Sequence, residues 1–182
     1  MNKSYSDIKY ELQKKLKTTE FTLTLEGAYH PDDADWNYKD VPHLNIAHTQ
    51  VEAIQAAIGE KSTATINFQK VVFFTLPLLV YNYEYAKGEQ VYFTSCGPFI
   101  LLINTKFKAT DAGTVVATTY LIGSKFPFNL LLPVLKRIVK RNYKILMSED
   151  TPMRERRGVL RNFGHSFYRD DDTYSFDFTT KI

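Results

Sequence analysis

The feature that most constrains the fold of this chain is its second half, where short strand-like segments are followed by one long amphipathic helix. The strand-like segments are residues 63–74, 78–86, 90–95, 98–109 and 114–122. Lys87-Gly88-Glu89 and Thr110-Asp111-Ala112-Gly113 have the composition of hairpin turns. Because these connections are short, the sequence predicts an antiparallel meander.

Residues 128–147 form the amphipathic segment, with an apolar stripe on one side and five basic residues on the other. We expect this helix to continue past Pro152 to about Arg161. We interpret the basic side first as a solvated face, with docking of an acidic electron donor as the alternative, and interpret Arg154, Arg156 and Arg157 in the same way. The helix needs a surface to cover, and a curved sheet needs its open face closed. The sequence therefore predicts an α+β helix-grip fold, a curved antiparallel sheet around the long C-terminal helix with an apolar cavity between them.

The first half of the chain is harder to interpret. Residues 5–17 have apolar positions at helical spacing, and residues 20–29 alternate like a half-buried strand. Residues 30–42 are polar and irregular, and residues 43–59 are compatible with a helix that stops at Gly59. No linker or repeat divides the chain. We expect one domain over residues 1–182, with a helical extension at 1–19 and a polar tail at 165–182.

Composition excludes several classes of protein. The net charge of +3 is too small to indicate nucleic-acid binding. The one cysteine, Cys96, excludes a disulfide framework and an iron–sulfur cluster or zinc ribbon built from this chain's own thiolates. No apolar run reaches ~18 residues, so we expect no membrane span. The polar N-terminus does not resemble a signal peptide, which predicts a cytoplasmic protein.

Aromatic residues are abundant, with 13 Phe and 12 Tyr against one Trp. Among the phenylalanines of the predicted meander, we interpret four first as core and second as the lining of a substrate pocket. They are Phe68, Phe73, Phe93 and Phe99.

Two of the four histidines lie close together, in Asp40-Val-Pro-His43-Leu-Asn-Ile-Ala-His48. Two imidazoles and one carboxylate form the facial ligand set of non-heme Fe(II) oxygenases, which leaves positions open for O₂ and substrate. A five-residue separation turns about 500° on an ideal helix, so the rings would point ~140° apart. His43 and His48 can therefore share a metal only if the segment bends or changes between them. His30 and His165 we interpret as loop residues.

Asp-x2-His-x4-His resembles the mononuclear-iron motif of the Rieske-type non-heme iron oxygenases, whose catalytic domain has the helix-grip (START/Bet v 1-like) fold. The resemblance implies that His43 and His48 are iron ligands and that Asp40 is the carboxylate linking the iron to a neighbouring subunit's cluster. The third ligand of the family is an aspartate on the C-terminal helix, which matches Asp150, with Glu149 as the alternative. Helix capping is the alternative interpretation of Asp40 and Asp150, and the sequence does not decide between the two roles.

This chain departs from the family because it has no cysteine–histidine motif for the Rieske cluster. Two hypotheses follow. The first is a catalytic subunit that holds mononuclear Fe(II) and hydroxylates a hydrophobic small molecule, with electrons from a separate Rieske or ferredoxin partner and a trimeric assembly as in many relatives. The second is a protein that binds a lipid or polyketide-like ligand without a metal, in which the histidines are polar anchors.

Overall fold

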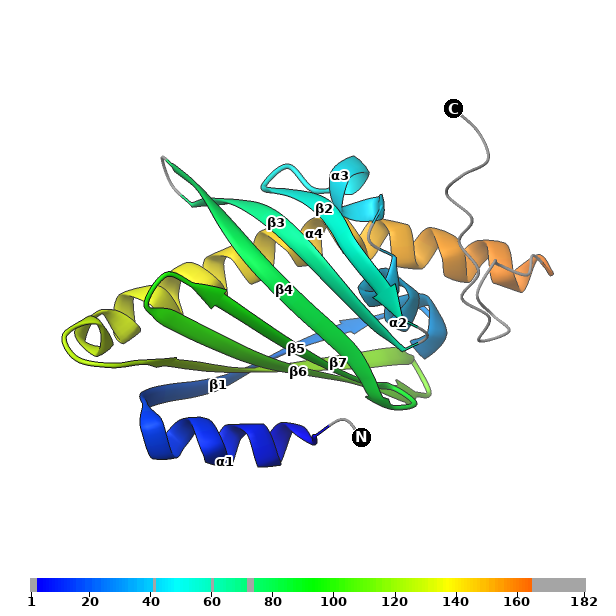
Figure 1. Ribbon diagram of the computed structural model, residues 1–182. Helices are drawn as coiled ribbons and strands as arrows, with labels where there is room; N and C mark the ends of the chain where they lie inside the picture. The colour runs from blue at the N-terminus through cyan, green and yellow to red at the C-terminus, as the bar shows by residue number, and fades with distance from the viewer. Residues whose placement is uncertain (1–2, 41, 60, 72–73, 165–182) are drawn as a thin grey trace.

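The computed structural model describes residues 3–40, 42–59, 61–71 and 74–164. Its central feature is a seven-stranded antiparallel sheet in the order β1-β7-β6-β5-β4-β3-β2 (Figure 1). The strands are β1 (Lys17–Gly27), β2 (Val51–Gly59), β3 (Ser62–Val71), β4 (Phe74–Ala86), β5 (Glu89–Cys96), β6 (Phe99–Thr110) and β7 (Gly113–Ser124). The helices are α1 (Tyr5–Lys15), α2 (Pro31–Lys39), α3 (Pro42–Ala47), the short 3-10 helix η1 (Phe128–Leu131) and α4 (Leu132–Asn162).

The meander predicted from the second half of the sequence is confirmed as β3 to β7. Both predicted turns are present, and each contains a glycine with a positive φ, 76° at Gly88 and 135° at Gly113. At Gly113 a Cβ atom would lie 2.2 Å from the main-chain oxygen of Gly27, so close approach of the chain also requires glycine. The turn therefore brings β7 beside β1, its partner over the whole length of both strands.

The predictions for residues 30–59 are partly wrong. Residues 43–59 do not form one helix, because α3 ends at Ala47 and residues 51–59 form the edge strand β2, which pairs with β3. The polar segment 30–42 is not irregular but contains α2. Its start signals are local, since the side chain of His30 accepts a hydrogen bond from the main-chain N–H of Asp32 and Pro31 occupies the first turn.

The two faces of the sheet are covered by different helices. On one face, which we call the outer face, α1 packs over a buried apolar cluster. Tyr5, Tyr83, Val91, Leu102 and Leu121 form that cluster, and Ile8, Leu12 and Phe93 pack against it. On the other, inner face, α4 runs across the concave side of the sheet, as Figure 1 shows. This is the predicted helix-grip arrangement.

The long helix α4 has the predicted extent, since it continues through Pro152 and ends at Asn162. Proline removes one main-chain donor, yet the helix is preserved because its flanking turns pack against other elements. Within the described residues, no helix is both long enough and apolar enough to cross a bilayer. The predicted C-terminal tail, with His165, lies outside the described residues.

Candidate ligand cavity and metal centre

A cavity of about 310 Å³ lies between the inner face of the sheet and α4. Aliphatic side chains form much of its wall, among them Leu76, Leu78, Leu101, Ile103, Leu135 and Ile138. The volume is at the lower end of the range for sites that bind small organic molecules. None of the described residues that line it is a lysine or an arginine.

The period of the strands decides which side chains reach this cavity. Residues 65, 67 and 69 of β3 and residues 92, 94 and 96 of β5 face it, so Phe68 and Phe93 project to the outer face. Phe99 does not line the cavity either, because its ring packs against that of Phe128, with centroids 6.4 Å apart. The expectation that these three residues line the pocket is therefore corrected, and Phe73 lies outside the described residues.

Three buried donor atoms meet at one end of the cavity. The Nε2 atoms of His43 and His48 lie 3.3 Å apart. Oδ1 of Asp150 lies 3.2 Å from Nε2 of His48 and 3.7 Å from Nε2 of His43. All three side chains are buried. Residues separated by about 100 positions in the chain are thus brought together where the segment that follows α3 meets α4, through hydrogen bonds of His48 and Thr49 to Glu149.

The end of α3 explains how two histidines five residues apart can converge. His43 lies inside the helix, whereas His48 follows the last helical residue, Ala47. The chain then turns into β2, and the side chain of Asn45 fixes this turn by two hydrogen bonds to the main chain of Ala53, at 2.9 and 2.6 Å. The backbone therefore leaves the helical conformation between His43 and His48, as a shared metal site requires.

Both imidazole rings are oriented through their other nitrogen. Nδ1 of His48 donates to Oε2 of Glu149 at 2.9 Å, and Nδ1 of His43 donates to the main-chain carbonyl of Asp40. In the neutral tautomers that these partners favour, each Nε2 atom carries a lone pair. The two lone pairs and the carboxylate oxygen of Asp150 therefore face one another, an arrangement that a shared cation stabilises.

Burial and charge act in opposite directions on these residues. Burial lowers the pKa of His43, and the negative charge of Asp150 offsets only part of this effect. Burial also disfavours the charged form of His48, but Asp150 and Glu149 outweigh it and raise the pKa of this imidazole. Burial alone would raise the pKa of Asp150, yet His48 and the charge of Arg154 lower it. The site thus combines a carboxylate with a neutral His43, both of which are competent ligands.

The interpretation of Arg154 as part of a solvated face is wrong, because this side chain is buried. Its guanidinium is fully buried and donates to Oδ2 of Asp150 at 2.9 Å. This bond leaves Oδ1 of Asp150 facing the histidines. Glu149 has a similar supporting role, because its Oε1 accepts hydrogen bonds from the main-chain N–H and the hydroxyl of Thr49. The four-residue spacing of Asp150 and Arg154 on one helix face is the signal that could have identified the arginine.

The donor set fits a divalent metal ion. Two nitrogen or oxygen donors bound to one ion at ~2.1 Å lie roughly 3.0–3.5 Å apart, and the observed separations are 3.2, 3.3 and 3.7 Å. Each ligand candidate also has a partner that orients it, as metal ligands in proteins do. Two imidazoles with one carboxylate suit Fe(II), although the set alone does not select it over other divalent ions.

Asp40 is placed differently from the three donors. It caps the C-terminus of α2 and borders the cavity, and its main-chain carbonyl is the partner of His43. The capping interpretation of Asp40 is thus consistent with its position, although at the end of α2 rather than the start of α3. Its proposed role as a carboxylate bridge to a neighbouring subunit stays a prediction.

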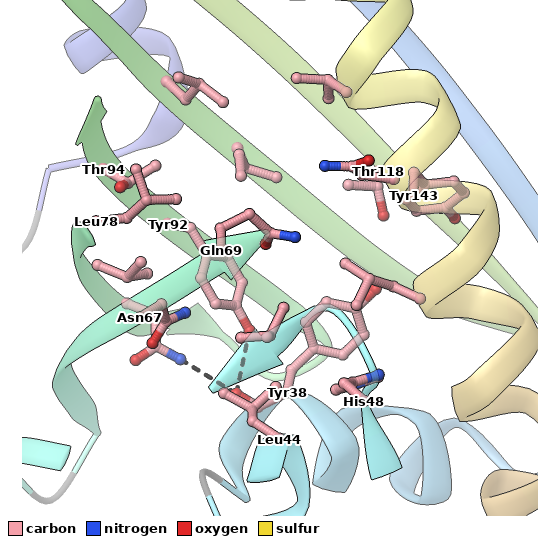
Figure 2. A pocket seen from close by; sticks show the side chains of 18 of the residues that line it. Tyr38, Leu44, His48, Asn67, Gln69, Leu78, Tyr92, Thr94, Thr118 and Tyr143 are labelled. Carbon is pink, nitrogen blue, oxygen red and sulfur yellow. Dashed lines mark hydrogen bonds between the residues drawn. The ribbon is translucent and has the colours of Figure 1, made fainter. Parts of the chain in front are cut away.

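The cavity wall also contains polar side chains other than the three candidate metal ligands. Oδ1 of Asn67 and Oγ1 of Thr94 are buried and have no hydrogen-bond partner among the described residues, and the same holds for both amide atoms of Asn37. Figure 2 shows Asn67 and Thr94 on the sheet side of the cavity, opposite Tyr143. Because buried polar atoms are almost always paired, these atoms indicate positions for polar groups of a ligand or for water.

Comparison with known proteins supports the fold more than the motif. No family model matches the sequence, and no curated protein is significantly similar to it. Several solved structures share the fold at low sequence identity. The Zhui aromatase/cyclase from Streptomyces sp. R1128 has a TM-score of 0.67 and 14% identity, with 83% of this chain and 99% of that chain covered. A START superfamily protein from Mycobacterium smegmatis has a TM-score of 0.62 and 10% identity, with 76% and 97% covered.

The di-domain aromatase/cyclase StfQ from the steffimycin biosynthetic pathway has a TM-score of 0.72 and 14% identity over 83% of this chain. This chain covers only 55% of StfQ, about half its length. Together these likenesses place the protein in the START/Bet v 1-like helix-grip class of folds. The finer resemblance to the Rieske-type oxygenases depends on the sequence motifs alone.

Proposed function

We propose that this protein binds a hydrophobic small molecule that carries neutral oxygen groups, in the cavity between the sheet and α4. The observation that carries the proposal is the cavity itself, about 310 Å³ in volume and with a mostly apolar surface. The solved structures of similar fold include aromatase/cyclases, two of them from biosynthetic pathways, which favours a small organic molecule as the ligand. Because no lysine or arginine lines the described wall, we expect a neutral ligand rather than an organic anion.

The polar atoms on the wall refine this proposal. A ligand that offers a hydroxyl group to Oδ1 of Asn67, or an oxygen to the hydroxyl of Thr94, would pair atoms that otherwise lack a partner. A purely hydrocarbon ligand would leave them buried and unpaired, which costs ~1–3 kcal/mol for each group. The ligand is therefore expected to be apolar over most of its surface and oxygenated at defined positions.

Three probes of equal ring size test this proposal by calorimetry or NMR titration: 2-naphthol, naphthalene and 2-naphthoate. We expect 2-naphthol to bind most tightly of the three in the metal-free protein. The double variant Asn67→Leu, Thr94→Val should remove the preference for 2-naphthol over naphthalene, and Thr22→Val, which changes an exposed threonine pair, should not. If none of the probes binds, or if the preference persists in the double variant, the proposal is wrong.

The three-donor cluster favours a second function in the same cavity. In this alternative, His43, His48 and Asp150 hold a mononuclear Fe(II), and the protein hydroxylates the bound molecule with electrons from a separate Rieske or ferredoxin-like partner. When bound there, Fe(II) would supply the activation of O₂. The residues of this chain would position the metal and the substrate and exclude water. Glu149 and the carbonyl of Asp40 would keep the protons on the Nδ1 atoms, so that both Nε2 atoms stay free to bind.

Anaerobic reconstitution with Fe(II), followed by metal analysis, separates the two functions. We expect about one iron per chain in the wild type and a loss of iron in His43→Ala and His48→Ala. His30→Ala is the matched control, because His30 is exposed and lies outside the cluster. A protein that binds 2-naphthol but retains no divalent metal would refute the oxygenase and leave the binding function intact. A trimer and an electron donor remain expectations of the sequence resemblance, and sedimentation analysis would test the first.

A further inference from the structure

The segment between β7 and α4 exposes an unusual number of large apolar side chains. We define the apolar tip as Phe126, Phe128, Leu130, Leu131 and Val134, whose exposed fractions are 78%, 45%, 70%, 50% and 51%. Single exposed apolar residues are normal on a protein surface. Five within nine consecutive residues form a contiguous patch of the kind that marks an interaction site.

The charge around the apolar tip is of one sign. From Ala112 to Ser148 the sequence contains six lysines and arginines and no aspartate or glutamate. Lys125 and Arg137 are exposed on either side of the tip. Lys136 and Lys140 lie over the ring of Phe21, 5.2 and 5.4 Å from its centroid, which places their charges beside the same end of α4. An apolar centre flanked along the chain by cations complements a surface that is apolar inside and anionic outside.

The apolar tip adjoins the end of the cavity that is farthest from the metal candidate. Leu135 in the first turn of α4, four residues after Leu131, lines the cavity. Asp150, fifteen residues further along the same helix, lines it as well. At 1.5 Å per residue these two positions are about 22 Å apart. Figure 1 shows the start of α4 at one end of the molecule, whereas α3 lies over a later part of the helix. The tip therefore stands at one end of the ligand cavity, with the donor cluster at the other.

We propose that the apolar tip docks on an anionic membrane surface. The exposed phenylalanines and leucines would enter the boundary between headgroups and acyl chains, and Lys125 and Arg137 would contact the anionic headgroups. No described helix can span a bilayer, so the association is peripheral. A protein partner is the competing occupant, but the absence of any acidic residue over residues 112–148 favours a surface of uniform negative charge. Docking at this end would place the cavity beside the phase in which apolar molecules accumulate.

Co-sedimentation with vesicles tests the proposal without ligand or metal, so its outcome does not depend on the proposed function. The full chain is mixed with vesicles of phosphatidylcholine alone or of equal parts phosphatidylcholine and phosphatidylserine. We expect binding to the anionic vesicles, weakened by salt, and little binding to the neutral ones. Neutralising both cations in Lys125→Gln, Arg137→Gln should weaken binding about 25-fold, which is about fivefold for each charge.

Removal of the apolar contacts should have a similar effect. The variant Phe126→Ser, Leu130→Ser should lower the partition coefficient at least about tenfold. Each control makes the same kind of substitution at an exposed position far from the apolar tip. Val159→Ser, 54% exposed near the other end of α4, is compared with Val134→Ser, and Lys108→Gln on β6 with Lys125→Gln. These controls should bind as the wild type does.

Three results would overturn the proposal. Absence of binding to anionic vesicles is the first, and equal loss in the tip and control variants is the second. The third is self-association of the protein, measured by sedimentation velocity, that is abolished by Phe126→Ser, Leu130→Ser while no variant changes vesicle binding. That result would assign the tip to a contact with a second copy of the chain.

Discussion

The two faces of the sheet are made by the same strands, yet they differ in what fills the space above them. On the outer face, Leu102 is fully buried in the cluster beneath α1. The next residue, Ile103, projects to the inner face and borders the cavity. Of these two adjacent aliphatic residues of β6, Leu102 therefore belongs to a packed core, whereas Ile103 lines a cavity. The short helix α1 closes one face, whereas the long helix α4 spans the other without filling it.

The difference extends to polar groups. The outer cluster consists of apolar and aromatic side chains, and its polar tips reach partners, since the hydroxyl of Tyr5 donates to Glu20 at 2.7 Å. The inner side buries Asp150, Arg154 and two histidines, together with amide and hydroxyl groups that have no partner among the described residues. Buried charge and empty volume both reduce stability. Their concentration on one side indicates that this side is the functional one.

The largest effect that tests this comparison is expected at Arg154. The variant Arg154→Met leaves the carboxylate of Asp150 buried without its cation, which should lower the free energy of unfolding by about 3–5 kcal/mol. Urea denaturation measures the change. The double variant Asp150→Asn, Arg154→Met removes both charges and should be more stable than Arg154→Met alone. If Arg154→Met is as stable as the wild type, the ion pair of Asp150 and Arg154 does not contribute to the stability of the inner side.

The contrast between neighbouring residues of β6 gives the second prediction. Leu102→Ala opens a cavity in a packed cluster and should lower the free energy of unfolding by about 3 kcal/mol. Ile103→Ala enlarges space that already exists, so the loss should be roughly 1 kcal/mol, because fewer contacts disappear. Urea denaturation at constant m-value checks both. Equal losses would show that the inner face is packed as tightly as the outer one.

For the affinity of ligand binding, we expect Ile103→Ala to have a larger effect than Leu102→Ala, the opposite of their order for stability. Ile103→Ala is expected to weaken 2-naphthol binding, because it removes part of the cavity wall. Leu102→Ala should leave the affinity of the folded protein unchanged, because its side chain lies across the sheet. A weaker affinity in Leu102→Ala alone would contradict the separation of the two faces.

How far the sequence predicts this molecule differs between its halves. The meander and α4 are predictable because each has a hydrophobic pattern that is sustained over many residues. The turns of the meander are marked as well, by Gly88 and Gly113. β2 is not, because residues 51–59 mix alanine with β-branched residues and fit either a helix or an edge strand. α2 was missed although its proline and aspartates are ordinary start signals. Local composition alone therefore leaves the segment around the candidate site ambiguous.

For the site, the sequence predicts which residues converge but not what surrounds them. The motif spacing identified His43 and His48, and the helix position identified Asp150, which the structure brings together. The phenylalanines were assigned to the pocket without knowledge of which face of the sheet borders the cavity. Alternation defines two faces but not which of them a helix fills, so Phe93 was placed on the wrong side. Arg154 was assigned to a solvated face because its basic neighbours suggest one, whereas its burial depends on tertiary packing.

The third prediction concerns the partner of His48. Glu149→Gln removes the charge that orients Nδ1 of His48 but keeps an oxygen for Thr49. We expect the affinity for Fe(II), or for Co(II) as an air-stable substitute, to fall ten- to a hundredfold, as is typical for residues that support a metal ligand. Titration calorimetry under anaerobic conditions measures it. Glu155→Gln, an exposed change on the same helix, is the control. An unchanged affinity would mean that His48 needs no such partner, or that it is not a ligand.

The smallest expected effect is a pH dependence of the metal-free protein, which probes the charge balance of the inner side. Burial disfavours the protonated form of His48, but Asp150 and Glu149 outweigh burial and raise its pKa above the ordinary value of 6.5. A group whose folded pKa is raised stabilises the protein below its unfolded pKa, and this contribution is lost as pH rises through the folded pKa. The stability advantage of the wild type over His48→Asn should therefore decrease as pH rises above about 6.5.

His43 produces a slope of the opposite sign, because burial lowers its pKa and the unfolded chain then binds more protons below 6.5. Burial, the main cause, acts on His43 in both proteins, whereas the smaller part of its pKa shift that comes from the charge of His48 is lost in His48→Asn and adds to the difference. Urea denaturation of the wild type and His48→Asn in the presence of a chelator gives the comparison. A difference that stays constant through this pH window would show that Asp150 and Glu149 do not hold a proton on His48. Saturation with a divalent metal should abolish the slope in the wild type, since the ion takes the place of the proton on Nε2.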